Sequence, residues 1–215
     1  MNLSIALDPG QRVDPAALVI VERIALFRDT PTSPQLFRWD IAHAQQWALQ
    51  TPHTVIVDDC VELLAQEALT GARFLFDATG VGVVYEDLFR QRYRNHDLKR
   101  PAYPLVITAG VLDNGMHVAK RNLVGRYEAK LSNGQIAVRA IALRKEIAKQ
   151  HERFRARISK SGADTYEAAR EGKDHDDLLL AAMVATYWPS PGGAPRYLAR
   201  DGRVYDRREL SNDPY

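Results

Sequence analysis

The sequence is poor in cysteine. Its 215 residues include one, Cys60. A single thiol excludes an intramolecular disulfide and a zinc site built from cysteines. A protein that depends on neither suits a reducing compartment, so we predict a cytoplasmic location.

Long apolar segments are missing as well. No apolar run reaches the ~18–20 residues that a membrane helix needs. The N-terminus shows neither the basic start nor the apolar stretch of a signal peptide. We therefore predict no membrane partner. The composition, 46% hydrophobic and 26% charged, is that of an ordinary globular protein.

Net charge is also small, at +2, so total charge does not identify a nucleic-acid-binding protein. The basic residues are nevertheless unevenly distributed. Two clusters lie at 90–100 and at 120–121, and a third runs through 144–160. Each cluster is either a solvated helix face or a patch that contacts phosphate, and the sequence leaves both interpretations open.

Apolar patterns predict the secondary structure. Strands are expected at 3–7, 16–26, 35–41, 73–76, 105–108 and 135–139. Helices are expected at 54–69, 83–93, 121–131, 140–158 and 175–188, with a hairpin at 157–168. Strands followed by alternating helices and strands predict the α/β class, with a mixed central sheet flanked by helices. We assign residues 1–188 to one domain and 189–215 to a C-terminal tail, which shows no periodicity.

Acidic residues stand at three element ends. Asp8 ends the apolar run LSIAL, Asp77 ends RFLF, and Asp176 with Asp177 opens the apolar run LLLAAMVA. Carboxylates that share one space repel each other and raise each other's pKa. Divalent cations relieve that repulsion, and carboxylate oxygens suit Mg²⁺ or Mn²⁺. The pattern favours a metal site, provided that the three positions meet in space.

Structural roles compete with that interpretation. Asp-Pro-Gly after position 7 is good turn chemistry, and Asp is favoured at helix starts by capping and by the helix dipole. Capping explains one acid before the last helix better than it explains the run Asp174-His175-Asp176-Asp177. Gly80 and Gly82 would allow a phosphate to approach the backbone after Asp77, although so short a motif is weak evidence.

Four short motifs in the same order resemble the RNase H-like nuclease domain of phage terminase large subunits. They are the strand-Asp-x-Gly hairpin at Asp8, the strand-Asp-x-x-Gly-x-Gly at Asp77, the segment KRNLV at 120–124, and His-Asp-Asp-Leu at 175–178. The resemblance covers roughly residues 2–188. It implies an RNase H-like fold.

The resemblance also implies site residues. The metal ligands and catalytic residues would be Asp8, Asp77 and one or both of Asp176 and Asp177, holding two Mg²⁺ or Mn²⁺ ions. Asp14 lies where the family often has a further acid. His175 would assist proton transfer or only cap the helix. Lys120, Arg121 and Arg126 would contact the DNA backbone.

The implied function is a metal-dependent DNA endonuclease that cuts concatemeric viral DNA at packaging, in the cytoplasm of a host cell. Its partners would be double-stranded DNA, a packaging ATPase domain, a small terminase subunit and a portal. The phosphate-loop motif of such an ATPase is absent from these 215 residues. The chain is therefore expected to be a stand-alone nuclease, an excised domain or a split gene product. Pro9 is a second departure, because it removes a backbone donor near the site.

Two other hypotheses remain. The first is another nuclease of the same fold, such as a Holliday-junction resolvase. The second is a non-catalytic DNA-binding or assembly module that keeps a vestigial acidic site. Metal titration separates the second from a nuclease, because a vestigial site should gain no stability from Mn²⁺.

Overall fold

The structure is a computed structural model. It describes residues 2–10, 14–26, 36–69, 71–96, 98, 102–158, 164–168, 176–187, 196–198 and 204–206. No helix in this part of the chain is long and apolar enough to cross a membrane.

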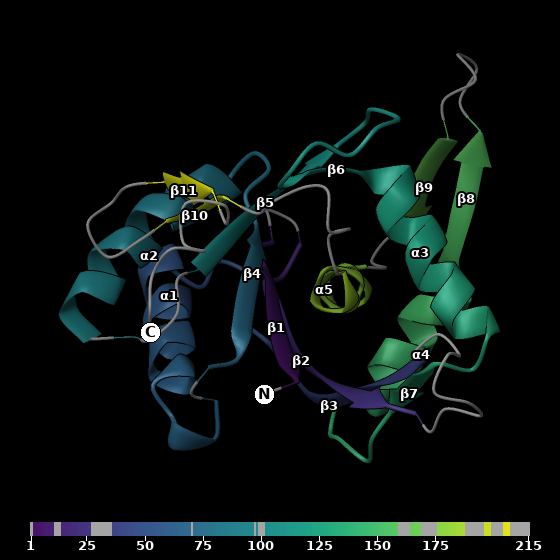
Figure 1. Cartoon of the computed structure of the whole chain (residues 1–215), viewed down its shortest axis with the longest axis horizontal. Helices are drawn as coiled ribbons and strands as arrows, with labels where there is room; N and C mark the ends of the chain where they lie inside the picture. The colour runs from purple at the N-terminus through teal and green to yellow at the C-terminus, as the bar shows by residue number, and fades with distance from the viewer. Residues whose placement is uncertain are drawn as a thin grey trace.

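A seven-stranded mixed sheet forms the centre of the fold, in the order β6-β5-β4-β1-β2-β3-β7 (Figure 1). The strands are β1 (Leu3–Asp8), β2 (Ala17–Ala25), β3 (Phe37–Gln46), β4 (Arg73–Asp77), β5 (Ala102–Thr108), β6 (His117–Ala119) and β7 (Ile136–Val138). The first three are antiparallel neighbours, whereas β4 pairs parallel to β1 and β5 parallel to β4. The predicted α/β class with a mixed central sheet is confirmed.

The central strand β1 is apolar because both of its faces are covered. Ile5 and Leu7 pack into the core on one face, and Ala6 packs into the core on the other. A strand buried on both sides has a continuous apolar sequence rather than an alternating one. The run LSIAL follows that rule.

Helices cover both faces of the sheet (Figure 1). On one face, α1 (His53–Leu64) and α2 (Gly82–His96) pack over the Ile5 and Leu7 side. On the other face lie α3 (Lys120–Ser132), α4 (Arg144–Arg153) and α5 (Asp177–Thr186). Helix α5 contacts β1 and β2 directly and is buried nearly all round, which explains its uniformly apolar sequence.

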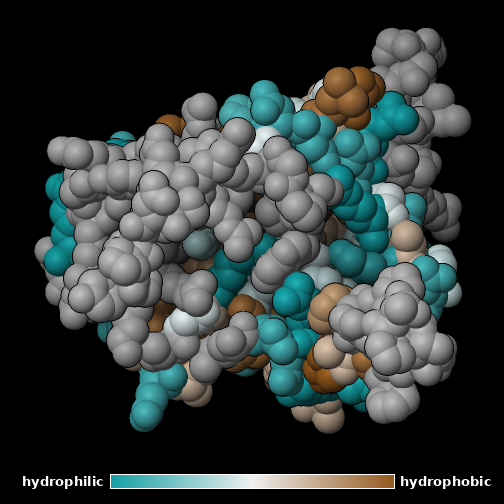
Figure 2. All heavy atoms as spheres, viewed as in Figure 1, coloured by the Kyte–Doolittle hydropathy of each residue, from teal (hydrophilic) through white to brown (hydrophobic). Residues whose placement is uncertain are grey.

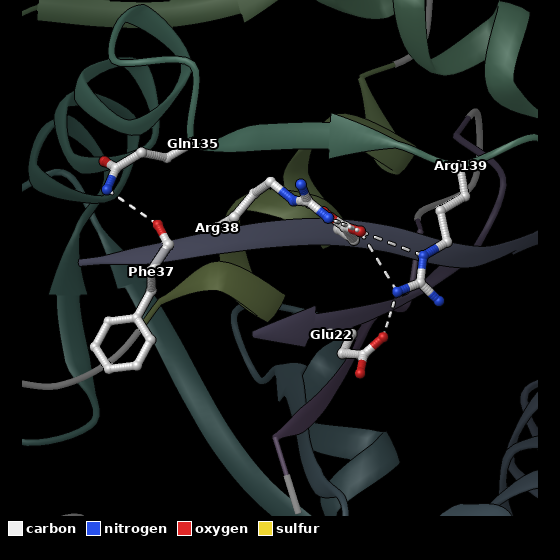
Figure 3. Close-up of polar contacts among 6 residues, drawn as sticks. Glu22, Phe37, Arg38, Gln135 and Arg139 are labelled. Carbon is white, nitrogen blue, oxygen red and sulfur yellow. Dashed lines mark hydrogen bonds and ion pairs between the residues drawn. The ribbon is translucent and has the colours of Figure 1, made fainter. Parts of the chain in front are cut away.

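The short strand β7 pairs parallel with β3, and side-chain contacts lie at both ends of the pairing. Arg38 Nε lies 2.7 Å from Asp40 Oδ1, and Arg139 lies 3.4 Å from Asp40 Oδ2 and also pairs with Glu22 (Figure 3). At the other end of the strand, Gln135 Nε2 donates to the Phe37 carbonyl at 3.0 Å. Asp40 is 5% exposed, and two arginines offset the cost of burying its charge.

Four sequence expectations about elements differ from the structure. The strand expected at 35–41 continues to Gln46, and β6 was not expected. The helix expected at 140–158 spans only Arg144–Arg153, because 154–158 forms strand β8 (Phe154–Ile158). That strand pairs antiparallel with β9 (Asp164–Ala168), so the hairpin begins earlier than expected. Within the tail, β10 (Arg196–Leu198) pairs with β11 (Val204–Asp206) and contacts β5.

Candidate active site

Asp8 and Asp77 end adjacent parallel strands. The β1–β4 register pairs Ser4 with Arg73 and continues to Leu7 with Phe76. Each strand then ends in its aspartate, so the two carboxylates leave the sheet side by side at one edge. Ligand sites of open α/β sheets lie at this carboxyl edge.

A tight turn fixes the direction of Asp8. The Gly10 N–H donates to Asp8 Oδ1 at 3.2 Å, and Gly10 has a φ of +66°. A Cβ at Gly10 would lie 2.6 Å from the Ala16 nitrogen, so a larger residue would disrupt the turn. From the helical layer, the buried Tyr85 hydroxyl donates to the Pro9 carbonyl at 3.3 Å. The carboxylate of Asp8 is therefore held by its own turn, and α2 contacts that turn at Pro9.

Asp77 is held in a similar way. The Thr79 N–H donates to Asp77 Oδ1 at 2.8 Å, and the Thr79 hydroxyl accepts from the Ile107 N–H at 2.8 Å. A Cβ at Gly82 would lie 2.0 Å from the Asp77 carbonyl oxygen. Packing against Asp77 therefore explains the glycine at 82, and the approach of a phosphate to Gly80 and Gly82 stays a prediction. The missing side chain of Gly82 lets α2 begin against the end of β4.

Asp177 reaches the same region from α5. It is 1% exposed, and two amides hold its carboxylate. Gln46, the last residue of β3, donates from Nε2 to Asp177 Oδ2 at 2.6 Å. Gln150 Nε2 lies 3.4 Å from Asp177 Oδ1. The Leu179 N–H donates to Gln150 Oε1 at 3.0 Å, which fixes the amide so that its nitrogen faces Asp177. We call Gln46 and Gln150 the amide pair.

Asp176 occupies the N-cap position of α5, but its side chain makes no capping hydrogen bond there. The first turn of α5 contains the buried Asp177, whose carboxylate accepts hydrogen bonds from the amide pair. A side-chain cap thus does not account for Asp176, which supports the interpretation of a surplus of acid at this helix start.

Electrostatics show that the four aspartates share one region. Burial raises the pKa of Asp8 well above its ordinary value, and the charges of Asp77, Asp177 and Asp176 raise it further. Asp8 retains some surface area, but its surroundings leave the carboxyl poorly hydrated. Burial also raises the pKa of Asp77, whereas hydrogen bonds from Thr79 and the charge of Lys120 lower it. Lys120, the first residue of α3, therefore faces the site.

This donor set fits hard divalent cations. It offers carboxylate oxygens from three elements, and burial disfavours the charged forms of Asp8 and Asp77. Lys120 offsets part of the negative charge at Asp77. Within the described ranges, no three His, Cys, Asp or Glu side chains already stand in a metal-binding arrangement. The structure brings the acids to one edge without closing a ligand cage.

The predicted DNA contacts divide into two kinds. Lys120 and Arg121 lie at the start of α3, and Arg121 is exposed. Arg126 is already engaged, because its guanidinium lies 2.9 Å from Asp113 Oδ2 and 5.2 Å from the centre of the Tyr187 ring. A role for Arg126 in holding Asp113 is thus visible, while its contact with DNA stays a prediction.

Two further expectations concern flanking residues. Asp14 lies just before β2, and its carbonyl oxygen is close to Gly10, so it belongs to the turn that follows Asp8. His175 lies outside the described residues. Sequence reasoning missed the amide pair and Asp113. A Gln in a polar strand end or a charged helix carries no signal of its own, since its partner is distant in the chain.

Comparisons with known proteins identify the fold. No protein-family model and no curated protein matches the sequence. Among solved structures, the large terminase nuclease from thermophilic phage G20c superposes with a TM-score of 0.61 at 19% identity, over 86% of this chain and 82% of that one. The same nuclease with bound magnesium gives a TM-score of 0.54 at 22% identity, over 85% and 79%.

The HK97 bacteriophage large terminase gives a TM-score of 0.55 at 15% identity, over 86% of this chain but 38% of that protein. The class that emerges is an RNase H-like α/β domain. More particularly, its fold is that of phage large terminase nuclease domains, as the sequence resemblance implied.

Proposed function

We propose that the chain is a metal-dependent DNA endonuclease of the terminase nuclease type. The observation that carries the proposal is the position of Asp8 and Asp77 at the ends of adjacent parallel strands, where the charges of Asp176 and Asp177 at the start of α5 also act on Asp8. Support comes from the fold shared with terminase nucleases, one of them solved with bound magnesium.

Asp8, Asp77 and Asp177 would hold two Mg²⁺ or Mn²⁺ ions, with Asp176 as the alternative or additional ligand from α5. Such ions supply a water activated for attack and stabilisation of the leaving 3′ oxygen. The protein contributes orientation: the Gly10 turn directs Asp8, Thr79 directs Asp77, and the amide pair directs Asp177. Lys120 would place a positive charge beside the phosphate.

The biological setting belongs to the proposal too. Duplex DNA is the expected substrate, cut from concatemers during packaging in the host cytoplasm. This chain corresponds to 38% of the HK97 large terminase. A packaging ATPase domain, a small terminase subunit and a portal are the partners that such a nuclease would serve.

Plasmid digestion tests the proposal. The purified chain should nick or linearise supercoiled plasmid with Mn²⁺ or Mg²⁺, and EDTA should abolish the cutting. Asp8→Asn and Asp77→Asn should each lower the rate by orders of magnitude while the protein stays folded. The matched control is Asp87→Asn, an acid on the surface of α2 whose side chain is 69% exposed.

Each alternative has its own outcome. Cutting that persists in EDTA would contradict metal dependence. DNA binding without cutting in any metal, and without stabilisation by Mn²⁺, would identify a non-catalytic module. A strong preference for four-way junctions over linear duplex, shown by a dimer, would favour a resolvase.

A further inference from the structure

The loop between β5 and β6 presents apolar side chains to solvent. Leu112 is 80% exposed and Val111 61%, the two highest values among the large apolar residues of the described chain. In Figure 2 an apolar patch stands at the top of the molecule, where Figure 1 draws this loop. Exposed apolar residues that stand on a protruding loop are candidates for contact with a partner.

Polar contacts hold this loop tip in place. Asp113 Oδ1 accepts from the Ala119 N–H and from Asn122 Nδ2, both at 3.0 Å, and Oδ2 accepts from Arg126 at 2.9 Å. Asn122 Nδ2 also donates to the Val111 carbonyl at 3.2 Å. Hydrogen bonds to the start of α3 and to Ala119 therefore hold the Val111 carbonyl and the Asp113 side chain, on either side of Leu112. A pre-ordered tip loses little conformational entropy on binding.

The loop rises from the edge that carries the aspartates. Strand β5 pairs parallel to β4, with Leu105 beside Asp77, and β6 pairs parallel to β5, with Ala119 beside Thr108. Lys120 follows Ala119 directly and begins α3. The apolar tip, the basic start of α3 and the acidic site thus share one edge of the sheet.

The size and the charge of the surface around Val111 and Leu112 favour DNA over a protein as the partner. Two side chains are far fewer than the roughly 20–30 residues per side of a stable protein interface. Lys120 and Arg121 at the base of the loop complement phosphate charge. Apolar side chains flanked by cations are the composition of wedges that enter the minor groove and part a base step.

We propose that Val111 and Leu112 form an apolar wedge that enters the minor groove of duplex DNA and seats the strand to be cut over Asp77. The inference rests on the proposed nuclease function. Parting a base step costs free energy, which contacts of the wedge offset. A mismatched duplex is already weakened at one step, so it should bind more tightly than a matched duplex of the same length.

Duplex binding without metal, measured by fluorescence anisotropy over a range of salt concentrations, tests the wedge. The Val111→Ser/Leu112→Ser variant should bind about 10-fold or more weakly, because burial of two apolar side chains is lost. Its salt dependence should keep the wild-type slope, since no phosphate contact is removed. The variant should also lose the preference for a mismatched duplex.

Two further variants separate the wedge from its support. Asn122→Ala keeps both apolar side chains but frees the Val111 carbonyl, so binding should weaken to a smaller extent. Val55→Ser is the matched control, because Val55 is 43% exposed on α1, outside the loop. It should bind as the wild type does.

Equal affinity and equal mismatch preference in the wild type and the double variant would overturn the wedge, even if the wild type cuts plasmid. A variant with a shallower salt slope would also overturn it, because the loop would then act through basic residues. A wild-type protein that neither binds nor cuts DNA would overturn the wedge and the proposed function together.

Discussion

At the scale of residues, the carboxylates that would bind metal lower the stability of the metal-free protein. Burial and three neighbouring carboxylates make the charged form of Asp8 unfavourable. A carboxyl whose pKa is raised in the native state still holds its proton at pH values where the unfolded chain has lost it. Its contribution to stability therefore falls as the pH rises from its ordinary value of 3.8 through the raised value. A bound cation would reverse this cost.

Asp8→Asn removes that cost. In metal-free buffer the melting temperature of Asp8→Asn should equal or exceed that of the wild type, and the difference should grow as the pH rises above the ordinary carboxyl pKa of 3.8. Added Mn²⁺ should stabilise the wild type and leave the variant nearly unchanged. Calorimetric melts at several pH values measure both effects, with Asp87→Asn as control. A variant that unfolds without metal would show that Asp8 is needed for the turn itself.

At the scale of elements, the amide pair links strand β3 and helix α4 to the site. Gln46 ends β3 and Gln150 lies on α4, and both contact the first residue of α5. Three elements are thereby positioned around one carboxylate. Partners that orient a ligand in this way commonly change metal affinity by about 10–100-fold when they are removed.

Gln46→Leu should lower Mn²⁺ affinity by about that factor, read from a thermal-shift titration without DNA. Gln150→Leu should do the same and also lower stability by roughly 1–3 kcal/mol, because it strands the buried Leu179 N–H. Gln45→Leu is the matched control, since adjacent strand residues point to opposite faces. Unchanged Mn²⁺ affinity in both amide-pair variants would restrict the pair to a purely structural role.

Local patterns account for some elements and miss others. The apolar runs before Asp8 and Asp77 predicted their strands because each is short, apolar and ended by a turn residue. The segment FRARI at 154–158 alternates apolar and basic residues, a strand pattern that the neighbouring charged helix obscured. Strand β6 has three residues, too few for any period to appear.

The site was predictable only in part. Its acids stand at element ends that can be located from the sequence, so their approach to one another could be expected. The amide pair could not, because Gln46 lies 131 positions from Asp177 and contacts it only through the packing of α5 on the sheet. Asp113 was missed for the same reason, since its anchoring role depends on how the loop folds back on α3.

At the scale of the whole molecule, the sheet separates two apolar cores, and the candidate site lies at the carboxyl ends of its parallel strands. The aspartates, the loop tip and the start of α3 lie along that edge, and α4 carries a separate group of basic residues. A DNA duplex is larger than any one of these features. The path of the duplex across the molecule is therefore found by testing which basic residues contact phosphate.

Lys120→Ala/Arg121→Ala addresses that path. If both residues contact phosphate, the variant should bind duplex more weakly, equally so for unrelated sequences. Its log–log salt slope should flatten by about 0.9 for each lost contact. Mn²⁺ binding should persist, because the carboxylates remain and a nearby positive charge has been removed. Arg144→Ala/Lys145→Ala, on the exposed surface of α4, is the comparison. An unchanged slope in the first variant and a flattened slope in the second would place the DNA along α4 and leave Lys120 as a residue that adjusts the charge around Asp77.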